Sequence, residues 1–446
     1  MGNAVKRPRI KDAIHIIEKL REAGYIAYLV GGHVRDKVRG AATDDYDIAT
    51  DATPREVRKI FPRTLGVGVS FGVVLVIMDG APYEVATFRS DMGYSDGRHP
   101  DDVRFTTPEE DAERRDFTVN AMFYDPVEDR VIDYVGGQKD IERRIIRTVG
   151  NPEDRFGEDK LRMLRAVRFA GKLGYEIEPE TAAAIVRHAR EILEVSSERI
   201  REELTKILTG PSPRKGIELA GELGLLEHIL PEVECMKGVG QPPEFHPEGD
   251  VFEHTMLALE KMPKNPEIEL AMGVLLHDVG KPPTYKMEDR IRFNGHAPVG
   301  ASMAEKIVRR LRFSKRQQDL IVELVRQHLK FMNVREMRTA KLKRFLRTDR
   351  FDLHLELHRI DCESSHGNLD NLEFCKKKLD EFDGEDNTLR PPPLITGKDL
   401  IEMGMEPGPV FKTILTRVED AQLDGSIKTR EEALDFVREM DLKGQN

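Results

Sequence analysis

Two aspartates one residue apart, Asp45 and Asp47, are the residues of this chain whose type and spacing point most directly to chemistry. We expect them at the start of a strand, where residues i and i+2 share a face, so that both carboxylates point the same way. Parallel carboxylates repel each other unless a divalent cation lies between them, and Mg²⁺ prefers hard oxygen ligands of this kind. Because an isolated pair of this type is more often a solvated turn, its interpretation depends on its neighbours in the sequence.

A glycine turn comes shortly before the two aspartates. The apolar run 25–30 predicts a buried strand, which ends at Gly31 and Gly32 and is followed by a short basic helix that contains Arg35. Two successive glycines let the backbone approach a triphosphate closely. The turn and the aspartates together predict metal-assisted phosphoryl or nucleotidyl transfer.

A second motif, Arg-Arg-Asp-Phe-Thr-Val-Asn-Ala, occupies residues 114–121. Its two arginines can neutralise triphosphate charge, and arginine does so with fixed bidentate geometry. Asn120 is suited to reading a ribose hydroxyl or a phosphate. The alternative is a salt-bridged helix start on the surface.

A third motif places Asp159 and Arg162 three residues apart in a predicted helix, Glu158–Leu173, so we expect them on one helix face. A carboxylate beside a guanidinium offers both acceptors and donors, and the pair can imitate the pairing edge of a nucleic-acid base. The alternative for this spacing is an ordinary intrahelical ion pair.

Histidines and aspartates form a separate pattern in the second half of the chain. An adjacent His277 and Asp278 follow the apolar run 274–276, and a charge buried there must be paired or bound to a metal. Imidazole and carboxylate ligands suit a divalent metal at an open hydrolytic site. The pattern consists of His254, His277, Asp278, His296, His328 and Asp361.

Composition limits the class of protein. A chain of 446 residues should hold two to four domains, at ~150 residues per domain. No apolar run approaches the ~20 residues that span a bilayer, the first eleven residues lack an apolar signal core, and the three cysteines lack paired spacing. We therefore expect a cytoplasmic protein without membrane association, disulfides or zinc–thiolate sites.

The net charge of −10 is unusual for a protein that binds nucleic acid, but whole-chain charge is a poor guide when basic residues are clustered. Each basic cluster is either a solvated helix face or part of a phosphate-binding surface. The clusters are Arg162, Arg165, Arg168 and Lys172; Lys306, Arg309, Arg310, Arg312, Lys315 and Arg316; and Lys341, Lys343, Arg344, Arg347 and Arg350.

Strand and helix signals divide the chain at about residue 150. Before it, turn-bounded apolar runs predict the strands 25–30, 45–49, 72–78, 83–88, 121–124 and 131–133, with helices over 11–23 and after Thr53-Pro54. After it, the sequence predicts helices over 158–173, 179–193, 197–208 and 213–223, a helical block over 242–384 and short helices over 397–440.

The glycine turn, the aspartate pair and the motifs at 114–121 and 158–162 occur in the order seen in class II tRNA nucleotidyltransferases, and this chain resembles that family. The family includes CCA-adding, CC-adding and A-adding enzymes and bacterial poly(A) polymerases. The resemblance implies an α+β fold with a polymerase-β-like nucleotidyltransferase head, a mixed sheet with helices, followed by helical parts. The predicted domains are the head (1–150), a nucleotide-selecting, RNA-binding neck and body (151–235), an HD domain (240–385) and a helical tail (390–446).

The resemblance also implies roles for individual residues. Asp45 and Asp47 would hold two magnesium ions, with Glu84 as a third carboxylate from a neighbouring strand, and residues 89–107 would form a flexible loop. Asp159 and Arg162 would select CTP or ATP as a protein template. The residues implied to bind nucleotide are Gly31, Gly32, Arg35, Arg115, Asp116, Asn120, Asp159, Arg162 and Arg165.

The histidine and aspartate pattern looks like that of the HD phosphohydrolase superfamily. The resemblance implies that His254, His277, Asp278 and Asp361 bind one divalent metal. His296 and His328 would hold a second metal, as in two-metal members.

The expected function is addition of C and A from CTP and ATP to the tRNA 3′ end, with a fused metal-dependent phosphohydrolase and an HD face that can support a homodimer. Two alternatives stay open. One is an A-adding enzyme or poly(A) polymerase with the same site, and the other is an HD hydrolase whose head only binds tRNA.

Overall fold

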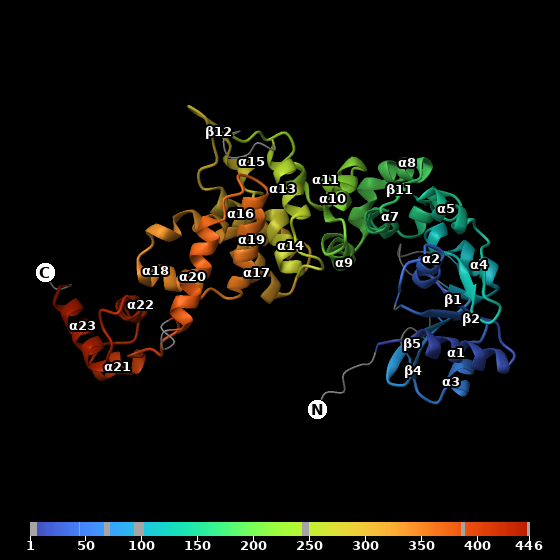
Figure 1. Cartoon of the computed structure of the whole chain (residues 1–446), viewed down its shortest axis with the longest axis horizontal. Coiled ribbons are helices and arrows are strands. Elements are labelled where there is room, and N and C mark those ends of the chain that lie inside the picture. The colour runs from blue at the N-terminus through green and yellow to red at the C-terminus, as the bar shows by residue number, and fades with distance from the viewer. Residues whose placement is uncertain are drawn as a thin grey trace. The chain divides into compact units, whose positions relative to one another are not determined.

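The computed structural model describes residues 7–43, 45–66, 72–92, 102–242, 249–384 and 389–443. It divides into two compact units, Met1–Glu234 and Cys235–Asn446 (Figure 1). The first unit contains a seven-stranded sheet and helices, whereas the second is almost entirely helical. This confirms the predicted α+β class, with a mixed sheet in the head and a largely helical remainder.

The head sheet has the strand order β3-β4-β5-β2-β1-β8-β9. The central β2 pairs with β5 in parallel, while the other neighbours in the sheet are antiparallel. This register sets Ile48 beside Val85, so Asp47 at the start of β2 lies level with Glu84 in the middle of β5. The strands are β1 (Ala27–Val30), β2 (Asp47–Thr50), β3 (Thr64–Leu65), β4 (Val73–Met78), β5 (Ala81–Thr87), β8 (Phe123–Asp125) and β9 (Arg130–Ile132).

The sheet is stabilised by apolar side chains on both faces. Helix α1 (Ile10–Glu22) packs on β1 and β2 and buries Ile16, Ile17 and Leu20 completely. Helix α3 (Pro54–Ile60) begins as predicted, with proline in its first turn and a capping box between Thr53 and Glu56. A cluster on the sheet is formed by Val30, Ala49, Phe88, Ala112, Ala121, Phe123 and Val149.

Shorter elements complete the first part of this unit. Strands β6 (Arg89–Met92) and β7 (Asp102–Phe105) pair with each other. The predicted flexible loop at 89–107 includes both strands, and its middle, residues 93–101, lies outside the described residues. The remaining elements up to residue 146 are α2 (Gly32–Val38), α4 (Pro108–Glu113), a short 3₁₀ helix (Thr118–Asn120), α5 (Gly137–Arg143) and β10 (Ile145–Ile146).

The helices that follow are close to those predicted, with one correction. The predicted helix Glu158–Leu173 is two helices, because Asp159 has extended backbone angles (φ −149°, ψ 105°) and ends α6. These helices are α6 (Pro152–Glu158), α7 (Leu161–Leu173), α8 (Pro179–His188), α9 (Ser197–Leu208), α10 (Pro213–Glu222), α11 (Leu226–Ile229) and α12 (Pro231–Glu234), with strand β11 (Glu176–Ile177) and a 3₁₀ helix (Ala189–Glu194) between them.

The second unit is built from helices with one small hairpin. Its first part consists of α13 (Val251–Glu260), α14 (Ile268–Leu276), α15 (Lys281–Thr284), the strands β12 (Lys286–Met287) and β13 (Ile291–Arg292), α16 (His296–Arg310) and α17 (Lys315–Gln327). A 3₁₀ helix (His328–Glu336), α18 (Thr339–Leu346), α19 (Phe351–Glu363) and α20 (Asp370–Gly384) follow. The chain ends in α21 (Gly397–Glu402), α22 (Pro409–Leu423) and α23 (Arg430–Lys443), which share their own apolar cluster.

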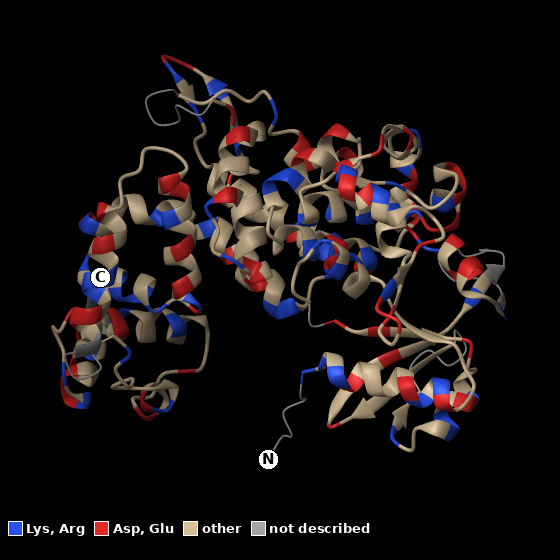
Figure 2. Cartoon of the chain, turned by 45° about the vertical axis from the view of Figure 1, so that its right-hand side comes forward, with Lys and Arg blue, Asp and Glu red and all other residues tan. Residues whose placement is uncertain are grey.

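Many basic side chains are neutralised within the fold, and Figure 2 shows acidic and basic residues side by side along most helices. Arg344 of α18 and Arg347, which follows that helix, both contact Glu419 of α22, so part of the predicted third basic cluster attaches the last helices to the unit. In α7, Arg162, Arg165 and Arg168 each contact a carboxylate. Of the predicted α7 cluster, Lys172 is thus the member available to an external anion.

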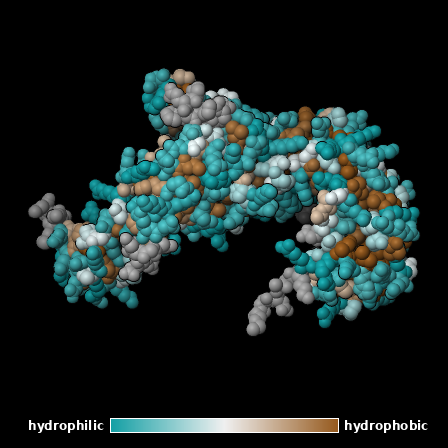
Figure 3. All heavy atoms as spheres, viewed as in Figure 1, coloured by the Kyte–Doolittle hydropathy of each residue, from teal (hydrophilic) through white to brown (hydrophobic). Residues whose placement is uncertain are grey.

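The described helices include none that is both long and apolar enough to cross a membrane. The face seen in Figure 3 is mostly hydrophilic with small apolar areas. The three cysteines are free, as the sequence predicts: Cys362 and Cys375 are buried and Cys235 is exposed.

Candidate functional sites

Three carboxylates lie within electrostatic reach of one another at the edge where β2 and β5 pair, although their oxygens are not all within 4.8 Å of one another. Asp47 is the first residue of β2, Glu84 lies in the adjacent parallel β5, and Asp45 precedes β2 by two residues. The strand therefore begins later than predicted, and Asp45 lies in the segment before it. That segment is free of the strand's hydrogen bonds, yet Asp45 still acts electrostatically on both Asp47 and Glu84.

The glycine turn lies directly against these carboxylates. Gly31 has φ +73°, a conformation that favours glycine, and it ends β1 where α2 begins. A Cβ added at Gly31 would be 3.7 Å from Oδ2 of Asp47, and one at Gly32 would be 3.8 Å from Oδ2 of Asp45. The missing side chains leave this edge open to a ligand that also reaches the carboxylates.

The electrostatics of the three carboxylates fit a divalent cation. Burial, followed by repulsion from Asp45 and Glu84, raises the pKa of Asp47 to about 7. Burial and the charge of Asp45 also raise the pKa of Glu84, and Arg115 opposes both shifts. Clustered oxygen ligands that destabilise one another when ionised are the donor set that Mg²⁺ or Mn²⁺ would neutralise.

A polar network connects four of the predicted nucleotide-binding residues. Arg35 is almost completely buried, and its Nη1 donates to Oδ1 of Asn120 at 2.7 Å. Asn120 lies within 3.4 Å of Oδ1 of Asp116, and Nε of Arg165 donates to the other oxygen of Asp116 at 2.9 Å. Arg35 thus contacts Asn120 directly, and Asn120 in turn connects it to Asp116 and Arg165.

Arg115 is oriented by a buried carboxylate. Its Nη2 lies 2.8 Å from Oδ2 of Asp111, which also contacts Arg114, and its guanidinium lies 5.6 Å from the centre of the Phe123 ring. Because its charge also acts on Asp47 and Glu84, Arg115 is within electrostatic reach of the acidic cluster.

Asp159 and Arg162 lie close together in the chain but each has its own partner. Oδ2 of Asp159 accepts from Nη2 of Arg199 at 2.6 Å, and its Oδ1 accepts from the backbone N–H of Leu161. Arg162 contacts Glu158 at 2.5 Å. The expectation of one shared helix face is wrong because Asp159 lies in extended backbone after α6, whereas Arg162 lies in α7, and each side chain is held by its own partner.

Sequence reasoning missed two residues at this end of the molecule. Arg199 lies 40 positions from Asp159, and no local pattern connects them. His33, inside the glycine motif, packs its ring 5.0 Å from that of Tyr46. Its Nδ1 is buried with no hydrogen-bond partner among the described residues. The sequence signal that could have pointed to His33 is its position directly after the Gly31-Gly32 turn.

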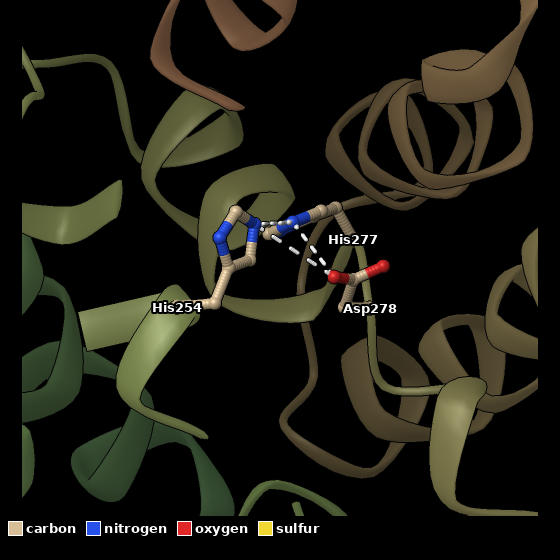
Figure 4. Close-up of side chains that lie close together, drawn as sticks. All are labelled: His254, His277 and Asp278. Atoms are coloured by element: carbon tan, nitrogen blue, oxygen red, sulfur yellow. Dashed lines mark hydrogen bonds and ion pairs between the residues drawn. The ribbon is translucent and has the colours of Figure 1, made fainter. Parts of the chain in front are cut away.

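The second unit brings together the predicted metal ligands. His254 comes from α13, while His277 and Asp278 directly follow α14 (Figure 4). Nε2 of His254 lies 3.1 Å from Nε2 of His277 and 3.2 Å from Oδ1 of Asp361 in α19. Oδ2 of Asp278 lies 3.3 Å from Nε2 of His277. His254, His277 and Asp278 are buried and form one candidate metal site, and the partly exposed Asp361 lies against it.

A second candidate site uses the other oxygen of the same aspartate. Oδ1 of Asp278 lies 3.4 Å from Nε2 of His296, at the start of α16, and 3.8 Å from Nε2 of His328, just after α17. The two imidazole nitrogens are 3.2 Å apart. Asp278 therefore faces two histidine pairs, one with each oxygen.

The protonation of this second pair fits a metal. Nδ1 of His296 lies 2.9 Å from the carbonyl of Phe293, and Nδ1 of His328 lies 2.7 Å from that of Val325. A carbonyl only accepts, so both Nδ1 atoms carry the proton and both Nε2 atoms expose a lone pair in the neutral ring. Burial lowers the pKa of His296, and that of His328 to about 4, which keeps the rings neutral near pH 7. Two lone pairs at this distance repel unless a cation lies between them.

Lys281 is a further residue that sequence reasoning missed. Its buried ammonium lies 2.6 Å from Oδ2 of Asp278 and donates to Oε1 of Gln241 at 2.6 Å. Burial alone would raise the pKa of Asp278, but Lys281 and the neighbouring imidazoles hold it well below its ordinary value. Asp278 is thus an ionised ligand. The sequence signal that could have identified Lys281 is its position three residues after Asp278, at the start of α15, which favours an ion pair with that aspartate.

Three family models match the chain. They are the poly A polymerase head domain over residues 27–147, the probable RNA and SrmB-binding site of polymerase A over 174–236, and the HD domain over 250–355. The third match includes five of the six predicted metal ligands and ends before Asp361.

Curated relatives match half of the chain. The CCA-adding enzymes of Geobacillus kaustophilus and Geobacillus stearothermophilus are 46% and 47% identical over 224 residues. Each match covers 50% of this chain and 55% of the relative, so the chain spans about half the length of these relatives.

Solved structures match over nearly the whole chain. The Bacillus stearothermophilus CCA-adding enzyme in complex with CTP has a TM-score of 0.75 and 28% identity, and the match covers 99% of both chains. The Thermotoga maritima CCA-adding enzyme complexed with tRNA has a TM-score of 0.58 at 19% identity, covering 98% of this chain and 97% of that one, and shows a shared fold.

Fold and matches together define a nucleotidyltransferase-type head with an RNA-binding helical segment and an HD domain. In this combination of domains the chain resembles the class II tRNA nucleotidyltransferases and poly(A) polymerases that its sequence motifs indicate.

The paired geometry around Asp278 predicts two metal ions in the second unit. After dialysis against Mn²⁺ and removal of free metal, we expect elemental analysis to find two tightly held ions per chain. The His296→Gln/His328→Gln variant should keep one ion, because His254, His277 and Asp361 remain. His366→Gln, which changes an exposed histidine just after α19, is the matched control. A variant that retains both ions would contradict the paired site.

Proposed function

We propose that this chain is a template-independent tRNA nucleotidyltransferase that adds C and/or A to the tRNA 3′ end from CTP and ATP by two-metal chemistry. The observation that carries the proposal is the acidic cluster of Asp45, Asp47 and Glu84 against the Gly31-Gly32 turn. The names of the relatives and the CTP bound to a structural neighbour support it. So do the folds of neighbours described in complex with ATP and tRNA.

Different residues of this chain would bind the cations, the triphosphate and its charge. Asp45, Asp47 and Glu84 would hold divalent cations, with Mg²⁺ as the proposed ion, and bound cations would stabilise charge on the triphosphate and lower the pKa of the attacking 3′-hydroxyl. Gly31 and Gly32 let the triphosphate approach the backbone. Arg115, oriented by Asp111, adds positive charge beside the same cluster.

Nucleotide selection would fall to Asp159 and Arg162. Arg199 and Glu158 fix these two side chains separately. A rigid acceptor and a rigid donor can discriminate the pairing edges of cytosine and adenine. A-adding, CC-adding and poly(A) specificities use the same chemistry and remain alternatives within this proposal. We place the enzyme in the cytoplasm, and dimerisation through the HD unit stays a prediction.

Staged substrates test the transferase. With tRNA lacking three, two or one terminal residues, in Mg²⁺, we expect CTP and then ATP to extend the ends in sequence. Asp45→Asn/Asp47→Asn should lower the rate at least ~10³-fold, because neutral amides cannot hold the cations. Asp79→Asn, an exposed head residue with φ +51°, which asparagine tolerates, should act like the parent. Undiminished addition by the double variant would refute the site, and extension by ATP alone would favour the A-adding alternative.

We also propose a metal-dependent phosphohydrolase in the second unit. The supporting observation is the pair of unprotonated Nε2 atoms of His296 and His328, which face each other beside the bridging Asp278. A substrate phosphate on such a centre would have its charge neutralised while an activated water attacks. The remaining alternative, an HD hydrolase whose head only binds tRNA, requires this activity without nucleotide addition.

Hydrolysis of p-nitrophenyl phosphate and bis(p-nitrophenyl) phosphate, assayed with Mn²⁺, Ni²⁺, Co²⁺ and Mg²⁺, tests this second site. His277→Ala/Asp278→Ala should abolish cleavage of either ester and leave nucleotide addition within about twofold, because the transferase residues lie in the other unit. His366→Ala is the control. Loss of both activities in a variant that unfolds at the parent temperature would contradict two independent sites.

A further inference from the structure

A crevice opens in the first unit between α7 and the turn that joins α9 to α10. Three basic side chains line it, Arg168 and Lys172 from α7 and Lys206 from α9. Backbone of the turn, around Gly210 and Ser212, supplies the opposite side.

The basic side chains are not balanced by acids. Nε of Arg168 lies 2.5 Å from Oε2 of Glu203, and Nζ of Lys206 lies 2.9 Å from Oε1 of the same carboxylate. Lys172 is exposed, and among the described residues no carboxylate lies within ion-pair distance of it. Three cations thus share one buried carboxylate. The crevice is suited to an anion that brings the missing charge.

The walls of the crevice are shaped by backbone in close contact. A Cβ at Gly216 would be 2.4 Å from Cγ2 of Ile207, and one at Gly171 would be 3.7 Å from the Cα of Gly216. A side chain at Gly216 would therefore press on Ile207 of α9, while α7 and α10 meet at ordinary contact distance at Gly171. The lining contains no aromatic ring on which a base could stack, so its basic side chains suit a phosphate group better than a nucleobase.

The crevice lies within electrostatic reach of the acidic cluster. Asp36 and Asp45 act electrostatically on Lys172 through space, against the charges of Arg35 and Arg168. Lys172 is thus coupled to an aspartate proposed to hold the catalytic cation.

We propose that this crevice binds a backbone phosphate of the RNA strand whose 3′ end is extended, through Lys172 and Lys206. This inference rests on the proposed transferase function and gives it an RNA contact outside the nucleotide site. A phosphate held there would position the strand without reading its sequence, which suits an enzyme that must accept every tRNA.

The Lys172→Gln/Lys206→Gln variant tests the proposal by separating the two substrates. We expect the KM for tRNA to rise about tenfold and the KM for CTP to stay unchanged. The plot of log affinity for tRNA against log salt should lose one to two units of slope, because each phosphate contact contributes about one. Lys19→Gln, which changes an exposed lysine on α1, is the matched control and should behave like the parent.

Other outcomes would contradict either the crevice as an RNA site or the transferase function. An unchanged tRNA KM and salt slope would overturn the crevice, and a raised KM for CTP alone would assign it to the nucleotide. If the parent adds no nucleotide, the transferase proposal fails, and fluorescence anisotropy with labelled tRNA then tests the crevice directly. In that assay, equal RNA affinity of the parent and the variant would overturn the proposed phosphate site. Matching unfolding temperatures exclude misfolding as the cause.

Discussion

Repulsion between like groups held at fixed positions is the constraint on which the two sites depend. In the head, the parallel pairing of β2 and β5 sets Asp47 beside Glu84, and the glycine turn keeps Asp45 in the same space. The sheet can hold these carboxylates together because α1 and the apolar cluster stabilise it from both faces. A divalent cation bound there would offset the repulsion that this arrangement imposes on the carboxylates.

The second unit applies the same principle with imidazoles. Carbonyls one turn earlier in the chain fix the Nδ1 protons of His277, His296 and His328, and this directs their Nε2 lone pairs inward. Asp278, kept ionised by Lys281, lies between the two pairs. Both units thus use secondary structure to hold groups that repel each other in the absence of a cation.

Sequence reasoning worked where the chemistry depends on local spacing. The Gly-Gly turn, the aspartate pair and the His-Asp doublet are short patterns, and the strands around them have strong apolar signals. It failed where a contact joins distant segments. The break at Asp159 is the clearest case, because the helical pattern runs through 158–173 without a proline or glycine at the break. Arg199, which holds Asp159 from α9, has no local signal at all.

The basic clusters show the same limit. Charge alone cannot tell an arginine that holds a tail helix, such as Arg344, from a lysine that faces an open crevice, such as Lys172. Only the folded chain shows which carboxylates are close enough to neutralise each cation. The net charge of −10 therefore carries little information on RNA binding.

The most direct test measures thermal unfolding of the head with and without Mg²⁺ at pH 8 and pH 5.5, in the parent and in Asp47→Asn. The folded-state pKa of Asp47 lies above its unfolded value, so the metal-free head should lose stability as the pH rises from about 4 to about 7. Mg²⁺ should raise the unfolding temperature of the parent more at pH 8, where protons no longer compete, than at pH 5.5. The variant should unfold at a higher temperature than the metal-free parent at pH 8 and gain little from Mg²⁺. Equal responses to Mg²⁺ in the two proteins, or none in either, would contradict a carboxylate cluster that binds divalent metal.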